Sequence, residues 1–212
     1  MANASSEKDY FPLDLSVANV NLEKINLANA IAVEAYIQQQ RELFDAEIAF
    51  GGYLEKRNLY QRSAHFTNEN SEERNIHIGI DLWTQAGTVI ICPLDGWIHS
   101  FKNNNSVGNY GPTIILKHQI ENEIFYTLYG HLSLESIKNI KVGMAFKKDE
   151  QLGALGNSSE NGDYPPHLHF QIIKNMENCI GDYPGVCSAS DLDFYAENCP
   201  DPNLLLKIKT LK

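Results

Sequence analysis

Histidine and aspartate side chains with the spacing of metal ligands occur near the middle of the chain. In His77-Ile78-Gly79-Ile80-Asp81 the apolar residues alternate with polar residues or glycine, and alternate residues of a strand face the same side. The isoleucines therefore mark the core side, and His77 and Asp81 line a cleft. An imidazole nitrogen and a carboxylate oxygen both suit zinc, and Gly79 between them leaves room for the ion.

A second pair of histidines lies in Pro166-His167-Leu168-His169-Phe170. His167 and His169 share one face of the expected strand, while Leu168 and Phe170 point into the core. One of the two histidines can complete a site with two histidines and one aspartate, and the other is left close to the metal. Three protein ligands leave the fourth position to water, as in catalytic zinc sites.

One more histidine ends an apolar strand in Tyr129-Gly130-His131-Leu132. The end of a strand favours a position in a cleft over one in the core. Two histidines beside the metal can orient a water molecule, accept its proton or stabilise an oxyanion. The remaining histidines, His65, His99 and His118, have no partner motif, and we interpret them as structural or exposed.

The surrounding sequence divides into three regions. Residues 1–62 are expected to be helical, with Asn21 as the N-cap and Gly51-Gly52 ending the helix. Residues 63–174 alternate short apolar runs with turn signals, which predicts an antiparallel β architecture. We expect strands at 76–82, 88–92, 97–101, 113–118, 124–129 and 167–173, a hairpin-type loop at 103–112 and a short helix at 132–137. Residues 175–212 are expected to form an irregular tail packed on the β domain.

Composition excludes several classes of protein. The 212 residues carry a formal charge of −10, which argues against a nucleic-acid-binding surface. No apolar run approaches the roughly 20 residues that cross a bilayer. The N-terminus has no apolar signal segment, so we expect a cytoplasmic protein, or a periplasmic or extracellular one if a leader has been lost.

The four cysteines form no Cys-x-x-Cys pair, so a thiolate zinc site is not expected. Cys92 lies in an apolar run and is expected to be a buried thiol. Among the C-terminal cysteines the sequence gives only weak support for a disulfide, such as one between Cys179 and Cys187.

Taken together, these motifs resemble the lysostaphin-like zinc endopeptidases. The resemblance covers about residues 75–173 and also includes Asp95-Gly96-Trp97-Ile98 and Gly153-Ala154-Leu155-Gly156. It implies one zinc ion per chain held by His77, Asp81 and His169, with His131 and His167 as the catalytic pair. It also implies a mainly β fold, an antiparallel, partly open barrel-sandwich with a substrate groove, similar to the glucose-permease IIA domain. Residues 63–174 would be this zinc peptidase-like domain, between an N-terminal helical extension and the tail.

The sequence departs from that family in two places. The family often has a tyrosine shortly before the first metal histidine, where this chain has residues 71–74, Ser-Glu-Glu-Arg. The loop before the second histidine pair, residues 157–165, is longer than usual and would border the groove. The flanks at 51–66 and 199–205 resemble segments around the peptidase-like domain of large bacterial proteins that also carry kinase-like and class III aminotransferase-like domains.

The resemblance implies a zinc-dependent amide hydrolase, an endopeptidase acting on peptidoglycan-type peptides or on a related small peptide. The alternative is a zinc-containing module that binds a ligand without turnover and serves a partner enzyme. A phosphocarrier is disfavoured, because the Asp81 carboxylate would repel a phosphoryl group on a neighbouring histidine.

Overall fold

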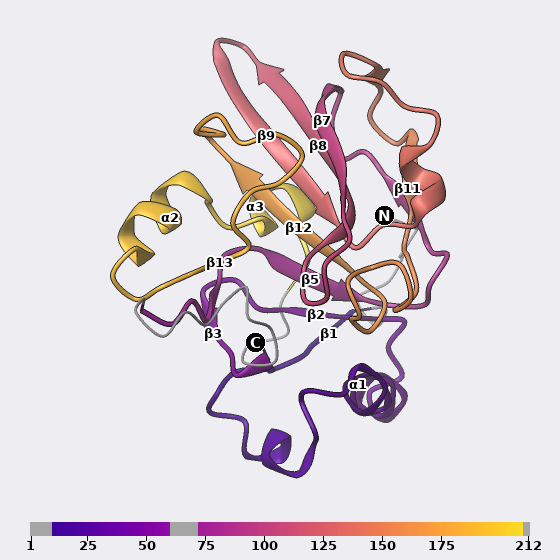
Figure 1. Ribbon diagram of the computed structural model, residues 1–212, viewed down its shortest axis with the longest axis vertical. Helices are drawn as coiled ribbons and strands as arrows, with labels where there is room; N and C mark the ends of the chain where they lie inside the picture. The colour runs from indigo at the N-terminus through magenta and orange to yellow at the C-terminus, as the bar shows by residue number, and fades with distance from the viewer. Residues whose placement is uncertain (1–9, 60–71, 210–212) are drawn as a thin grey trace.

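An eight-stranded, open sheet forms the centre of the molecule (Figure 1). The computed structural model describes residues 10–59 and 72–209. The strand order is β1-β2-β5-β12-β9-β8-β7-β10, with β1 and β2 parallel and the other neighbours antiparallel. Its strands are β1 (Tyr10–Pro12), β2 (Ile48–Gly51), β5 (Ile80–Trp83), β7 (Gly96–Asn104), β8 (Gly111–Ile120), β9 (Glu123–Gly130), β10 (Ala145–Phe146) and β12 (His167–Ile173).

Two smaller sheets, three α-helices and two 3-10 helices complete the described fold. One small sheet has the order β13-β4-β3 and the other pairs β11 with β6. Their bounds are β3 (Glu55–Lys56), β4 (Ile76–His77), β6 (Val89–Ile91), β11 (Gln151–Ala154) and β13 (Val186–Cys187). The α-helices are α1 (Ala30–Leu43), α2 (Leu192–Asn198) and α3 (Asn203–Leu206), and 3-10 helices span Val20–Lys24 and Leu134–Ile137. The predicted mainly β, antiparallel and partly open fold is confirmed.

The N-terminal region differs from the single helix predicted for it. Asn21 lies inside the first 3-10 helix, and α1 begins only after Asn29, whose side chain accepts hydrogen bonds from two backbone N–H groups of the first turn. The helix ends at Leu43, so Gly51-Gly52 does not terminate it. Residues 48–51 instead form β2, which pairs with β5 inside the main sheet. The apolar run Ile48-Ala49-Phe50 is buried, and this long-range burial outweighs the helical periodicity that precedes it.

The central strands follow the sequence pattern closely. Strand β12 has the predicted bounds, and the predicted strand at 76–82 divides into β4 and β5 around residues 78 and 79. Strands β7 and β8 are longer than expected, so the loop between them is shorter, and the predicted helix at 132–137 is a 3-10 turn. No helix in the described part of the chain is long and apolar enough to cross a membrane.

The C-terminal segment is more regular than predicted and packs on the β domain. It contains β13, α2 and α3, and buried Met176, Tyr183 and Cys199 join a core cluster with residues of β4, β8, β9 and β12. All four cysteines are free, so the weakly supported disulfide between Cys179 and Cys187 is absent. Cys92 is a buried thiol, as expected.

Candidate metal centre

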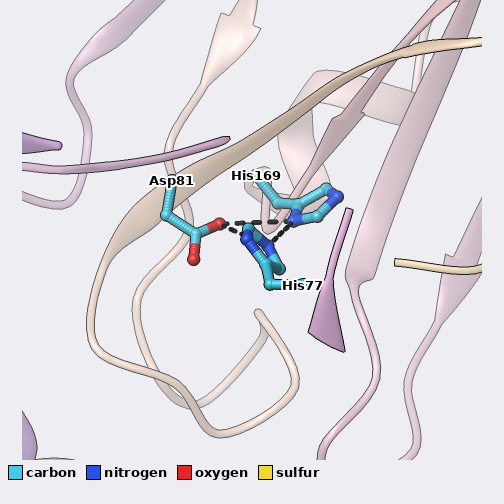
Figure 2. Close-up of side chains that lie close together, drawn as sticks. All are labelled: His77, Asp81 and His169. Atoms are coloured by element: carbon cyan, nitrogen blue, oxygen red, sulfur yellow. Dashed lines mark hydrogen bonds and ion pairs between the residues drawn. The ribbon is translucent and has the colours of Figure 1, made fainter. Parts of the chain in front are cut away.

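Strand β12 brings the predicted ligands together through its pairing. In the register of the sheet, His169 lies opposite Asp81 of β5 on one side and opposite Gly130 of β9 on the other. Directly paired residues of neighbouring strands project from the same face, so Asp81 and His169 meet. His77, the last residue of β4, completes the group, and Figure 2 shows the three side chains converging.

The three side chains, hereafter the metal triad, each offer one potential metal-ligand atom, and these three atoms lie close to one another. His77 Nε2 lies 2.9 Å from His169 Nδ1 and 3.4 Å from Asp81 Oδ1, and the His169 Nδ1 to Asp81 Oδ1 distance is 3.2 Å. All three residues are buried. Ligands of tetrahedral zinc, each about 2.0–2.1 Å from the ion, lie roughly 3.3 Å from one another. The spacing of the triad therefore fits zinc.

Hydrogen bonds on the outer side of each imidazole assign the tautomers. His77 Nδ1 lies 2.9 Å from the carbonyl oxygen of Gly52, so Nδ1 carries the proton and donates it. His169 Nε2 lies 3.0 Å from Oε1 of Gln171, whose amide nitrogen donates to the carbonyl of Pro184. Both inner nitrogens then present lone pairs to the Asp81 carboxylate. The two inner nitrogens and the carboxylate oxygen all carry lone pairs and no proton between them. A bound cation would stabilise this arrangement.

A buried arginine balances the charge of the triad carboxylate. Arg57 Nη1 donates to Asp81 Oδ2 over 2.6 Å, and Arg57 Nε donates to Glu55 Oε2 over 2.5 Å. Burial alone raises the pKa of Asp81, but His77, Arg57 and His167 together hold that pKa well below its usual range. Asp81 is therefore ionised, with Oδ2 engaged by Arg57 and Oδ1 directed to the other two members of the triad.

His131 and His167, hereafter the histidine pair, lie beside the triad with their rings 4.1 Å apart. His131 Nδ1 donates to the carbonyl of Asn161 and His167 Nδ1 to that of Pro165, each over 2.7 Å. Each Nε2 therefore carries a lone pair, and that of His167 is 3.7 Å from Asp81 Oδ1. Burial is the largest cause that lowers the pKa of both imidazoles. Both are neutral near pH 7 and able to accept a proton.

The backbone of His131 has the left-handed φ of 62°, which is rare and costly for a residue with a side chain. Its amide donates to the carbonyl of Tyr110 and its ring is held by Asn161. Tertiary contacts therefore impose the conformation that turns this ring toward His167.

The structure gives a new physical reason for Gly79 and an additional role for the loop at 157–165. A Cβ at position 79 would lie 2.6 Å from His169 Cε1, so Gly79 makes room for an imidazole ring rather than for the ion itself. The long loop at 157–165 does border the site. It also supplies the two carbonyls that orient the histidine pair, and Tyr164 packs its ring 5.1 Å from that of His131.

All five predicted site residues therefore lie together, and the structure adds others that the motifs did not indicate. Gln171 was detectable, because it lies two residues after His169 on the same strand face. Arg57 had no signal in its local sequence. Among the other histidines, His118 is buried between Asp95 and Thr127 and His99 bonds Ser100, both in structural contacts. His65 lies outside the described residues.

A buried group of two imidazoles and a carboxylate, beside two neutral histidines in an open β fold, is a site of the metallohydrolase type. Residues 75–179 match the model of peptidase family M23. The chain therefore carries an M23 peptidase domain, and the resemblance noted in the sequence is confirmed at the level of the family.

An uncharacterised metalloprotease of Haemophilus influenzae is 33% identical over 99 residues, which are 47% of this chain and 19% of that protein's length. The lysostaphin catalytic domain from Staphylococcus simulans is 24% identical, with 57% of this chain and 80% of that chain covered and a TM-score of 0.40. A variant catalytic domain of the prophage-encoded M23 protein EnpA from Enterococcus faecalis is 20% identical, with 57% and 87% covered and a TM-score of 0.40.

Proposed function

We propose that this domain is a zinc-dependent amide hydrolase that cleaves peptidoglycan-type peptides or a related small peptide. The observation that carries the proposal is the convergence of three unprotonated donor atoms, His77 Nε2, Asp81 Oδ1 and His169 Nδ1, within 3.4 Å of one another. These three residues would hold one zinc ion. The family match to M23 peptidases supports the same assignment.

When bound, zinc supplies Lewis acidity, which polarises an amide carbonyl and makes water a better nucleophile near neutral pH. The histidine pair performs the proton transfers. Both imidazoles present an unprotonated Nε2, so one accepts a proton from the attacking water and the protonated ring returns it to the leaving nitrogen. The water oxygen joins the carbonyl carbon, the C–N bond breaks, and the products are one carboxylic acid and one amine.

The second imidazole of the pair stays neutral and holds the water by accepting a hydrogen bond at its unprotonated Nε2. Two equally neutral rings 4.1 Å apart allow only one positive charge at a time, because like charges at this distance repel. One histidine therefore acts as the base while its neighbour stays neutral and positions the water.

The test uses the purified chain, stripped with a chelator and reloaded with zinc, against a panel of peptides and peptidoglycan fragments. New amino groups measure cleavage, and elemental analysis measures the metal. We expect one zinc per chain, loss of both metal and cleavage in His169→Ala, and retention of metal with loss of cleavage in His131→Ala. His99→Ala, away from the site, is the matched control.

Full zinc occupancy without cleavage of any member of the panel would refute the hydrolase. Release of zinc by His131→Ala would refute the assignment of the ligands. Zinc-dependent retention of a ligand without turnover would instead identify a binding module.

A further inference from the structure

The triad carboxylate divides its two oxygens between different partners. Oδ1 of Asp81 lies 3.4 Å from His77 Nε2 and 3.2 Å from His169 Nδ1, whereas Oδ2 accepts a hydrogen bond from Arg57 Nη1 over 2.6 Å. Figure 2 shows one oxygen of Asp81 joined to both histidines and the other directed away from them. A carboxylate can bind a metal through one oxygen or through both, and here only one of them faces the other ligands.

The arginine that holds Oδ2 comes from outside the part of the chain that matches the peptidase family. Arg57 directly follows β3, and the family match begins at residue 75. Strand β3 pairs with β4 so that Glu55 lies opposite His77, and the amide of Arg57 donates to the carbonyl of Asn75 over 2.9 Å. The pairing of β3 with β4 thus places the guanidinium beside the triad.

Contacts on several sides hold the Arg57 side chain in this position. Its Nε donates to Glu55 Oε2 over 2.5 Å, and Glu55 Oε1 accepts from the backbone amide of Leu15 over 3.2 Å. The guanidinium carbon also lies 5.5 Å from the centre of the Trp83 ring, which is within the range of a cation–π contact. The arginine side chain is 2% exposed. A planar guanidinium with two anchored carboxylate partners cannot turn away from Asp81 without breaking an ion pair.

Gly52 makes room for this guanidinium and also holds a second member of the triad. Its backbone has the left-handed φ of 102°, and a Cβ at this position would lie 1.8 Å from Arg57 Nη2. A side chain here would therefore displace the guanidinium as well as strain the backbone. The carbonyl of Gly52 accepts from His77 Nδ1. Residues 52–57 thus fix His77 through a backbone carbonyl and Asp81 through a guanidinium.

Glu55 prevents the arginine from making the site positive. Glu55, Arg57 and Asp81 are joined by two ion pairs, and two carboxylates with one guanidinium leave a single negative charge. This is the charge that Asp81 alone would present to a metal ion. Arg57 can therefore hold one oxygen of Asp81 without repelling a cation from the other.

Building on the proposed function, we propose that Arg57 is a positioning residue that restricts Asp81 to a single metal–oxygen bond. A catalytic zinc site has three protein ligands and leaves a fourth position to water or substrate. A second oxygen from Asp81 would occupy that position. By holding Oδ2, Arg57 keeps the fourth position available for the water that the histidine pair orients.

Cobalt(II) in place of zinc tests this role in the full chain, because its visible absorption is stronger with four ligands than with five or six. Arg57→Met removes the donor to Oδ2, and Arg57→Lys keeps a cationic donor. Arg41→Met is the matched control, since the Arg41 guanidinium donates to Gln38 and to the backbone carbonyl of Glu47. Elemental analysis measures the metal content of each protein.

We expect one metal ion per chain in all four proteins. The spectra of wild type, Arg57→Lys and Arg41→Met should be those of four ligands. In Arg57→Met the molar absorption should fall at least about two-fold, because both oxygens of Asp81 then bind. The kcat of the zinc-loaded Arg57→Met protein should fall about ten-fold, since the position of the water is filled.

An unchanged spectrum of Arg57→Met at full metal occupancy would overturn the inference. Loss of the metal from this variant would also overturn it, because Arg57 would then be needed for binding itself. A wild-type spectrum with more than four ligands would do the same, and this result needs no variant to fold. Wild type that binds metal but cuts no peptide would refute the hydrolase and leave the spectra to decide the role of Arg57. Wild type that binds no metal would refute both proposals.

Discussion

Gln171 controls the tautomer of one triad imidazole, so its replacement by methionine should weaken zinc binding. Its Oε1 accepts the Nε2 proton of His169 over 3.0 Å, and its own amide group is held by Pro184 and Cys199. Without this acceptor, the proton of His169 can move to Nδ1, the atom directed at the triad. Loss of such an outer hydrogen bond typically costs 10–100-fold in metal affinity, or about 1.4–2.7 kcal/mol.

Competition against a chromophoric chelator at pH 7.5 measures the zinc affinity of wild type and Gln171→Met. The matched control is Gln119→Met, because Gln119 is exposed on β8. We expect zinc affinity to fall 10–100-fold in the first variant and to change by less than two-fold in the second. Equal affinities of wild type and Gln171→Met, with the fold intact by circular dichroism, would refute the tautomer argument.

Three further predictions follow from the burial of the site. Arg57→Ala removes the partner of a carboxylate that is 4% exposed, and it should lower the unfolding free energy of the zinc-free protein by about 3–5 kcal/mol; a loss below about 1 kcal/mol in urea denaturation would contradict this. Gly79→Ala places a methyl group 2.6 Å from His169 Cε1 and should reduce zinc occupancy in elemental analysis; full occupancy would show that the ring can shift freely. Burial lowers the pKa of His77 to about 4, against about 6.5 in the unfolded chain. The unfolded state therefore binds more protons below pH 6.5, and the stability of the zinc-free protein should be complete above pH 6.5 and fall toward pH 4. Denaturation midpoints that do not change across this range would contradict it.

Local alternation of residue types was sufficient to predict most of the β domain and the five site residues. His167 and His169 alternate with buried Leu168 and Phe170, and this pattern gave β12 its bounds. His77 and Asp81 meet as expected although β4 and β5 are separate strands. The alternation of polar and apolar residues predicts which face of a strand a side chain occupies, because it depends only on residues close together in the sequence.

Long-range and backbone contacts could not be predicted in the same way. β2 joins the sheet through partners 30 to 34 residues away, and the preceding helical pattern gave no sign of this. Arg57, which forms an ion pair with Asp81, lies in the region predicted as an N-terminal helical extension outside the β domain. The carbonyls of Gly52, Asn161 and Pro165, which orient three of the four histidines at the site, carry no side-chain signature at all. Backbone acceptors become visible only once the chain is folded.

The pairing of β2 with β5 has a consequence for dissecting the protein. Strand β5 carries Asp81, and β2 covers the hydrogen-bonding edge that β5 would otherwise present. A fragment cut at residue 75, where the family match begins, would leave that edge open to pairing with another molecule. It would also lack Arg57, the counter-charge of Asp81. The boundary defined by sequence similarity is therefore not a boundary of folding, and fragments intended to behave as monomers need the first strands as well.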